Sequence, residues 1–333
     1  MTAPLRVGLM GCADIARRRM LPAMAASPDV EIAAIASRDL DRAAACARRF
    51  GGRPLRGYDA LLRSADVTAV YVPLPTALHA RWVEAALLAG KHVLAEKPLA
   101  TDQATAQRLV VLAAERGLAL MENVMFVRHG QHAVVRELLA AGAIGEPRAF
   151  HAAFTVPRRP EGDIRHRADL GGGALWDTGV YPLRAALDLL GPDQIVVGAV
   201  LSAGPRLEVE TWGSALLRTP RGAAVHLTFG LDNAYASMYS IWGSEGTITL
   251  GHAFTPAADH RPSIRLGLPS GAKTITLEPA DQVAAALAAF VTAARSQPPP
   301  GDDGCVRQAK LLDEIRSAAS PANHQRLSRE TYV

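Results

Sequence analysis

Two short motifs contain the residue types that reduction of a carbonyl group requires. The first is Glu96-Lys97-Pro98, whose lysine ammonium can stabilise a developing alkoxide and can also give up a proton. The second reads D-T-G-V-Y from Asp177 to Tyr181, so a carboxylate and a phenol share one face of a helix. When a carbonyl is reduced, negative charge develops on its oxygen and must then be protonated. The two motifs together therefore favour this chemistry.

The composition makes Lys97 more informative than an ordinary lysine. Only four of the 36 basic residues are lysine, and the other 32 are arginine. Arginine does not lose its proton in proteins, so a lysine retained in such a chain indicates a need for lysine itself. Each motif alone has a plainer explanation. Lys97 fits a surface residue beside an acid, and Tyr181 fits the buried side of an amphipathic helix.

A glycine turn near the N-terminus predicts a dinucleotide site. The segment from Gly8 to Ala16 reads G-L-M-G-C-A-D-I-A, follows a strand-like run and opens a helix. Tight turns in this context let a pyrophosphate approach the backbone N–H groups of a helix N-terminus. Ala13 replaces the middle glycine of the usual pattern, and a plain strand-to-helix turn is the alternative. We expect cofactor contacts from Gly11, Cys12, Ala13, Asp14, Ile15 and Ala16.

The end of the second strand indicates which dinucleotide is bound. Enzymes that use NAD place a carboxylate there for the ribose 2′-hydroxyl. This chain has Ser37-Arg38 instead, and a hydroxyl with a guanidinium suits a 2′-phosphate. We therefore expect NADPH/NADP rather than NAD. The alternative is that Arg38 is a solvated residue at the start of a helix, with its positive charge offset by Asp39.

The order of the elements predicts an α/β chain with two domains. Strand-like and helix-like runs alternate over the first 120 residues, which predicts a doubly wound Rossmann domain with a parallel sheet over residues 1–123. Hairpin-linked strands follow, with turns at residues 244–246 and 270–271 and one helix over 173–190. They predict an α+β domain over residues 124–333 with a large open, mostly antiparallel sheet. This domain is expected to bind substrate and to form oligomers, and its C-terminal helix can pack back on the first domain.

Charge and composition exclude several classes of protein. The net charge of +4 is spread along the chain, so no nucleic-acid partner is expected. No apolar run reaches the ~18–20 residues that cross a bilayer, and no signal-peptide pattern opens the chain. We therefore expect no membrane partner and a cytoplasmic location. Three cysteines without metal spacing, and only His129 and His132 at close helical spacing, predict neither a metal site nor a disulfide framework.

Taken together, the motifs resemble the glucose–fructose oxidoreductase/inositol dehydrogenase/MocA family over essentially the whole chain. The resemblance rests on the glycine turn, V-P-L-P-T leading to His79, E-K-P-L from Glu96, and the motif from Asp177 to Tyr181. Many members carry histidine where this chain has Tyr181. The run from Gly11 to Pro22, with G-G-G-A-L-W-D before the second motif, is most similar to the nucleotide-hexose 3-ketoreductases of deoxysugar biosynthesis.

The resemblance implies a reaction and further site residues. The reaction is hydride transfer from NADPH to the C-3 ketone of a dTDP-linked 3,4-diketo-2,6-dideoxyhexose. Lys97 stabilises the alkoxide, either Lys97 or Tyr181 protonates it, and Asp177 orients Lys97 or holds a sugar hydroxyl. Positions near the nicotinamide and its ribose fall on Leu74, His79, Glu96 and Asn123, with Tyr58 near the adenine. Arg165 is implied as a cofactor or substrate contact, Arg19 as facing the diphosphate of the sugar nucleotide, and Tyr235 as a wall of the substrate pocket.

Two other functions share these motifs, and one surface bears on assembly. An NAD(P)-dependent dehydrogenase of a free sugar or polyol needs the same cofactor and catalytic residues. A non-catalytic NADP-binding regulator needs the first domain alone, although retention of Lys97 and Tyr181 argues against it. The alternating segment over residues 223–229 is expected to present an apolar sheet face, which predicts a homodimer or homotetramer through the open sheet.

Overall fold

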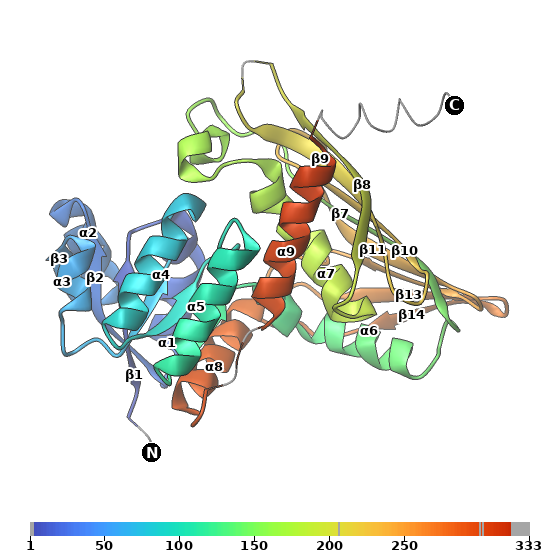
Figure 1. The fold of residues 1–333 in the computed structure, drawn as a ribbon. Helices are drawn as coiled ribbons and strands as arrows, with labels where there is room; N and C mark the ends of the chain where they lie inside the picture. The colour runs from blue at the N-terminus through green and yellow to red at the C-terminus, as the bar shows by residue number, and fades with distance from the viewer. Residues whose placement is uncertain (1–2, 206, 300, 302, 321–333) are drawn as a thin grey trace. The chain divides into compact units, whose positions relative to one another are not determined.

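The structure is a computed structural model that describes residues 3–205, 207–299, 301 and 303–320 (Figure 1). Contacts within the chain divide it into two compact units. Among the described residues, the first unit holds 3–100, 104–125 and 282–306. The second holds 101–103, 126–281 and those from Arg307 onward.

The first unit contains a six-stranded parallel sheet in the order β3-β2-β1-β4-β5-β6. All four residues of β4 are buried, which is typical of a parallel strand covered on both faces. The strands are β1 (Leu5–Met10), β2 (Val30–Ser37), β3 (Arg53–Arg56), β4 (Ala69–Val72), β5 (His92–Ala95) and β6 (Leu120–Glu122). The helices and helical turns are η1 (Ala16–Met20), α1 (Leu21–Ala26), α2 (Leu40–Phe50), α3 (Tyr58–Leu62), η2 (Thr76–Leu78), α4 (His79–Leu88), α5 (Gln103–Glu115) and α8 (Gln282–Arg295).

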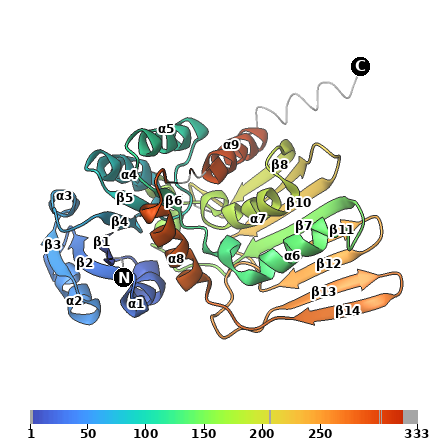
Figure 2. The ribbon, with the colours of Figure 1, turned by 90° about the horizontal axis from the view of Figure 1, so that it is seen from below.

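The Rossmann sheet confirms the predicted fold class, with two additions. The sequence did not indicate β3 or α3. Strand β3 reads R-P-L-R and is largely exposed, because it lies at the edge of the sheet, where a proline is tolerated. Helix α8 packs on α1, and its Phe290 and Leu287 join the core of the first unit (Figure 2). Residues 282–306 thus belong with the N-terminal part of the chain and not with the unit that precedes them.

The second unit contains an eight-stranded sheet in the order β14-β13-β12-β11-β7-β10-β9-β8. Only β7 and β10 pair in parallel, and the expected turns join β11 to β12 and β13 to β14. Helices α6 and α7 lie on one face of the sheet (Figure 2). The strands are β7 (Pro147–Thr155), β8 (Ile195–Ala203), β9 (Glu210–Arg218), β10 (Ala224–Gly230), β11 (Ala236–Gly243), β12 (Thr247–Gly251), β13 (Ser263–Leu268) and β14 (Gly271–Thr276). The helices and turns are η3 (Met125–Arg128), α6 (Gly130–Ala140), η4 (Ile164–His166), η5 (Ala168–Leu170), η6 (Leu175–Gly179), α7 (Val180–Leu190) and α9 (Asp303–Ala318).

The sheet alternation corrects one prediction about the outer surface. The apolar residues of β10 are Val225, Leu227 and Phe229, and they are at most 1% exposed because α7 and η6 pack on their face. The expectation that this segment presents an exposed apolar face is therefore wrong. The exposed large apolar side chains of the sheet come instead from strands β8, β9 and β11: Ile195, Val197, Val200, Trp212, Met238 and Trp242.

Candidate active site

The glycine turn brings three of the predicted cofactor residues together. Gly11 has φ +96°, a conformation that favours glycine, and its N–H donates to Ala36 O over 2.8 Å at the end of β2. A Cβ on Gly11 would lie 2.9 Å from Leu74 Cδ2 and 3.4 Å from the hydroxyl oxygen of Tyr58. The close approach of this backbone to Leu74 and Tyr58 leaves a cradle that any larger residue would fill. This is the property that a pyrophosphate site needs.

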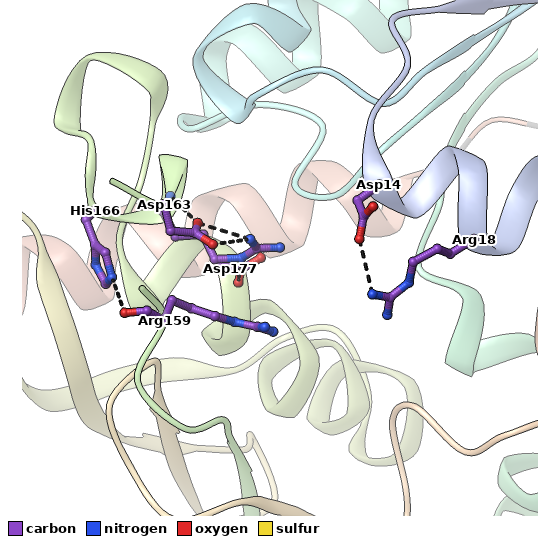
Figure 3. A network of polar contacts seen from close by, with 7 residues as sticks. Asp14, Arg18, Arg159, Asp163, His166 and Asp177 are labelled. Carbon is purple, nitrogen blue, oxygen red and sulfur yellow. Dashed lines mark hydrogen bonds and ion pairs between the residues drawn. The ribbon is translucent and has the colours of Figure 1, made fainter. Parts of the chain in front are cut away.

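Charged groups surround the start of the helix that follows this turn. The Asp14 carboxylate accepts from Arg17 Nη2 over 2.9 Å. It also accepts from Arg18 Nη1 over 3.1 Å, as Figure 3 shows. Arg19, the predicted diphosphate contact, is half-buried in the π-helical turn η1. The pairing of Asp14 with two guanidinium groups offsets its charge beside the predicted anion site.

The end of β2 has the features expected of a 2′-phosphate site. Ser37 is buried, and its hydroxyl accepts from the Asp39 N–H over 3.2 Å. Asp39 caps α2 by accepting from the N–H groups of Asp41 and Arg42, so its carboxylate is committed to the helix. Arg38 is exposed. Burial raises the pKa of the Tyr58 phenol, and Arg38 acts against that shift.

A buried network lies at the ends of β4, β5 and β6. The Glu96 Oε1 atom accepts from the Tyr71 hydroxyl and from Asn123 Nδ2, both over 2.7 Å. Burial, with the Glu96 charge beside it, raises the pKa of Tyr71 well above its usual range, so its proton stays on the phenol. Asn123 Oδ1 is buried, and none of the described residues gives it a hydrogen-bond partner. A buried acceptor without a donor fits a site completed by a ligand such as the ribose of a dinucleotide.

Histidine 79 joins two loops at the same sheet edge. Its ring is 1% exposed, with Nδ1 2.7 Å from Pro98 O and Nε2 2.7 Å from Leu74 O. Carbonyl oxygens only accept, so a neutral ring satisfies one contact and a charged ring satisfies both. Burial lowers the pKa of His79, and the two carbonyl oxygens oppose that shift. With both nitrogen atoms engaged, His79 fixes the loops of Leu74 and Pro98, and its predicted place beside the nicotinamide ribose stays a prediction.

Lys97 is half-buried directly after β5, at the carboxyl end of the parallel sheet. Its neighbours are held on both sides. Glu96 N–H donates to Val72 O, and Leu99 N–H donates to Glu122 Oε1 over 2.7 Å. Ligands of doubly wound folds bind at this edge. Glu122, the last residue of β6, is 4% exposed and was not predicted as a site residue. The only signal in the sequence is that it directly precedes Asn123.

In the second unit, Asp177 belongs to an ion-pair network. Arg165 Nε donates to Asp177 Oδ2 over 2.7 Å, and Arg165 Nη1 lies 3.2 Å from Asp163 Oδ1. Figure 3 shows the two carboxylates close together. Asp163 also accepts from the Arg165 N–H over 2.9 Å and so fixes the backbone of η4. The carboxylates raise the pKa of Arg165, which therefore remains a permanent cation beside Asp177.

The triple glycine before Asp177 has a packing explanation. The N–H groups of Gly172 and Gly173 donate to the carbonyls of Arg167 and Arg165, both over 2.9 Å. Gly173 has φ +120°, and a Cβ there would overlap Glu210 Oε1. Glu210 in turn accepts from the Leu175 N–H over 3.1 Å, at the start of the turn that carries Asp177. Glu210, which comes from the distant strand β9, was not predicted, and no pattern in the sequence points to it.

We expect Gly173→Ala to destabilise the second unit. A residue with a side chain at φ +120° costs about 1–3 kcal/mol in backbone strain, and overlap with Glu210 adds to this. Urea unfolding measures the loss. Gly162→Ala is the matched control, because Gly162 has φ +88° with nothing within 4 Å of its Cβ position. Equal losses in the two variants would show that contact with Glu210 contributes nothing.

Tyr181 lies among aromatic side chains at the start of α7. Its ring centroid is 4.4 Å from that of Phe154, 5.9 Å from Phe126 and 5.9 Å from Phe254. Three rings fix the orientation of the phenol, and the side chain remains half-buried. Gly179, between Asp177 and Tyr181, lets Leu175 and Phe229 approach closely, because a Cβ there would lie 3.3 Å from each of these side chains.

The expected helix over residues 173–190 begins as the π-helical turn η6, which contains Asp177, and continues as α7. Such turns are frequent at functional sites. Tyr235, the predicted pocket wall, is 53% exposed, with its hydroxyl 3.4 Å from Thr255 Oγ1. Each unit thus brings some predicted residues together: Gly11, Tyr58 and Leu74; Glu96 and Asn123; Asp177 and Arg165. The meeting of Lys97 with Tyr181 at one ketone stays a prediction.

Comparison with known protein families agrees with this division of the chain. Residues 5–124 match the oxidoreductase family with an NAD-binding Rossmann fold, and residues 132–249 match the GFO/IDH/MocA C-terminal domain. The chain belongs to the GFO/IDH/MocA oxidoreductase family. The family resemblance stated from the motifs is confirmed.

Several members of the family are similar over nearly their full length. A dTDP-3,4-didehydro-2,6-dideoxy-alpha-D-glucose 3-reductase of Actinomadura kijaniata is 50% identical, with 95% of this chain and 96% of the relative covered. The protein of that name from Streptomyces violaceoruber is 52% identical, with 95% of both covered. A solved 3-ketoreductase from A. kijaniata, in complex with NADP and TDP-benzene, has a TM-score of 0.92 at 50% identity, with 95% and 98% covered. Variants of that ketoreductase with one lysine or one tyrosine replaced have also been solved.

Two kinds of feature do not occur in the described part of the chain. Over those residues, no helix is long and apolar enough to span a bilayer. Within the same ranges, no three histidine, cysteine, aspartate or glutamate side chains gather in a way that could hold a metal ion.

Proposed function

We propose that this protein uses NADPH to reduce the C-3 ketone of a dTDP-linked 3,4-diketo-2,6-dideoxyhexose. The observation that carries the proposal is full-length similarity, at about half of all positions, to 3-reductases of that substrate. The residues at the end of β2 support the choice of cofactor, because Arg38 is exposed there and the nearby Asp39 is occupied in capping α2. The Gly11 cradle and the buried Asn123 oxygen fit the rest of a dinucleotide.

The reaction requires three contributions from the protein's own residues: a positive charge at the ketone oxygen, a proton, and a contact that holds the sugar. The chemistry that bound NADPH supplies is a hydride for the ketone carbon. Lys97 places a positive charge beside the ketone oxygen, where alkoxide charge develops, and such charge is worth most where water is excluded. Tyr181 donates the proton from its hydroxyl to that oxygen, its ring held by Phe154 and Phe126.

Asp177 holds the sugar. Arg165 donates to Asp177 Oδ2 and remains cationic, and the carboxylate that it orients accepts from a sugar hydroxyl. The ion pair of Arg165 with Asp177 connects the turn η6 to η4. Glu210 in β9 also stabilises η6, by accepting from the Leu175 N–H. Tyr181 and Asp177 are thus presented from one rigid segment.

A substrate panel tests the proposal. NADPH oxidation at 340 nm is measured with the dTDP-linked diketo sugar, with the same sugar lacking the nucleotide, and with free glucose, xylose and inositol. Turnover only with the nucleotide-linked sugar is the expected result. Turnover with a free sugar or polyol would assign the protein to that class of dehydrogenase instead. NADPH binding without turnover of any substrate would favour a regulator.

Replacing the phenol tests its assignment as proton donor. Tyr181→Phe is expected to lower kcat about 10²-fold, because it removes the acid and keeps the ring that packs on Phe154 and Phe126. The KM for the sugar nucleotide and the circular dichroism spectrum should not change. A loss of less than about tenfold would move the proton donor to Lys97.

We also propose that the outer face of the eight-stranded sheet binds a second copy of this chain. Trp242 and Met238 are exposed on β11 and Trp212 on β9. Between these strands His151 and His226 stack at 4.6 Å, and Trp242 packs on His151. Burial lowers the pKa of His151, which favours its neutral ring at pH 7. An apolar face of this kind suits a self-complementary two-fold contact.

Light scattering tests the assembly. The unaltered protein is expected to have the mass of two or four chains, and Trp242→Arg that of one, because a guanidinium would be buried without a partner. Leu88→Arg is the matched control, since Leu88 is 51% exposed on α4 and lies outside the sheet. A single-chain mass for the unaltered protein would refute the proposal.

A further inference from the structure

Two buried cysteines lie in contact between the dinucleotide turn and α2. Cys12 directly follows Gly11 and is 7% exposed, and Cys46 lies in α2 and is 4% exposed. Cys12 Sγ donates to Arg42 O over 3.6 Å, one helical turn before Cys46, and each thiol acts on the pKa of the other. Both are reduced in the structure. The reaction proposed above uses neither thiol.

A cavity gives access to this pair. It has a volume of about 290 Å³ and is lined by both cysteines, Ala45, Phe50 and three arginines, Arg17, Arg42 and Arg49. Arg17 comes from η1 and the other two from α2, while Tyr58 from α3 also interacts with Cys12. A small oxidant such as a peroxide fits a space of this size. The guanidinium groups favour the thiolate, which is the reactive form of cysteine.

We propose that Cys12 and Cys46 form a reversible disulfide that weakens dinucleotide binding. The feature that supports it is the position of one partner inside the phosphate-binding turn and of the other on the helix that follows Arg38. Such a pair couples the redox state to the two parts of the site that bind the dinucleotide phosphates. The inference uses the proposed NADPH site for its readout, whereas formation of the disulfide is independent of it.

The oxidation is balanced with hydrogen peroxide. The Cys46 thiolate attacks one peroxide oxygen, the O–O bond breaks, and a sulfenic acid and one water form after proton uptake. The Cys12 thiol then attacks the sulfenic sulfur, forms the S–S bond and releases a second water. The two thiols together lose two electrons and two protons, and these reduce the peroxide to two waters. Dithiothreitol reverses the step by thiol–disulfide exchange.

The electrostatic surroundings favour Cys46 as the attacking residue. Burial raises the pKa of both thiols, that of Cys12 to about 11. The Cys12 thiol and the charges of Arg17 and Arg49 lower the pKa of Cys46 against that shift. Because the thiolate fraction grows with pH below the pKa, the oxidation rate should rise about tenfold per unit between pH 7 and 9.

Bond formation changes the turn. The S–S distance in a disulfide is about 2.05 Å, shorter than any contact between two thiols, so Cys12 must move toward α2. Gly11 precedes Cys12 and already lies against Leu74 and Tyr58, which leaves little room to absorb the shift. The backbone N–H groups of the turn are then displaced from where a pyrophosphate needs them.

The test compares the reduced and the peroxide-treated full chain. NADPH affinity is first measured by fluorescence on the reduced protein. After treatment at pH 8.5, the denatured protein should keep one of its three free thiols, and a peptide map should link Cys12 to Cys46. The Kd for NADPH should rise at least about tenfold and recover with dithiothreitol. Cys46→Ala should keep its affinity under peroxide, and Cys305→Ala should respond as the unaltered protein does.

Three outcomes would overturn the inference. They are the absence of the linked peptide at pH 8.5, an unchanged Kd in the linked protein, and an equal loss of affinity in Cys46→Ala, which would assign the effect to oxidation of Cys12 alone. Failure of the proposed function looks different. In that case the reduced chain binds neither NADPH nor NADH, the switch fails with it, and the peptide map still decides whether the disulfide forms.

Discussion

Lys97→Ala is expected to lower kcat for the keto-sugar nucleotide by at least about 10²-fold, with NADPH affinity little changed. The reason is the position of this ammonium. Lys97 follows β5 at the ligand-binding edge of the sheet, and contacts of Glu96 with Val72 and of Leu99 with Glu122 fix the chain on both sides. Removing the side chain takes away the charge that meets the developing alkoxide and leaves the backbone around it in place. Stopped-flow measurement of NADPH oxidation gives the rate directly.

Lys97→Arg separates charge from proton transfer. Arginine keeps the positive charge but gives up no proton, so a substantial recovery of rate assigns Lys97 to electrostatic stabilisation and leaves the proton to Tyr181. Lys273→Ala is the control, because Lys273 is exposed on β14. Full activity in Lys97→Ala would contradict the whole catalytic assignment.

The parts of this site that could be predicted are those that local chemistry determines. Gly11 could be predicted because it is a glycine between a strand-like and a helix-like run. Its φ of +96° explains why the residue is glycine. Ser37-Arg38 and Lys97 lie near the ends of short apolar runs, which locate buried parallel strands within a residue or two. The first sheet was predicted from the alternation of strand-like and helix-like runs, and the second from strand-like runs joined by hairpin turns.

The parts that could not be predicted depend on contacts between distant segments. Glu210 in β9 accepts from the Leu175 N–H at the start of the turn that contains Asp177. Nothing in the sequence around either segment indicates this contact. Arg165 was predicted to contact a ligand, and the structure adds its ion pair with Asp177, twelve residues later. Strand β3 was missed because an edge strand needs no apolar pattern. The buried side of β10 was assigned to solvent because alternation shows two faces and does not say which one a helix covers.

Arg38→Glu is expected to raise the Kd for NADPH about 10²-fold and to bring NADPH and NADH affinities close together. A charge-assisted hydrogen bond contributes about 1.5–3 kcal/mol, and each 1.4 kcal/mol is a factor of ten, so loss of the guanidinium alone accounts for about 10–100-fold. A carboxylate at the end of β2 then repels the 2′-phosphate and accepts from a ribose 2′-hydroxyl, which favours NADH. Fluorescence titration with each dinucleotide measures both effects.

The matched control for this change is Arg48→Glu. It alters the net charge by the same amount on an exposed position of α2, two turns beyond the helix start. If general attraction of a tetra-anionic cofactor to a basic unit were responsible, both variants would lose affinity equally, and both losses would fade together as salt is raised. A loss confined to Arg38→Glu, with NADH binding kept, instead locates the choice of cofactor in the side chain at the end of β2. Because the Arg38 charge also acts on the pKa of Tyr58, Tyr58→Phe measures how much of the loss depends on that phenol.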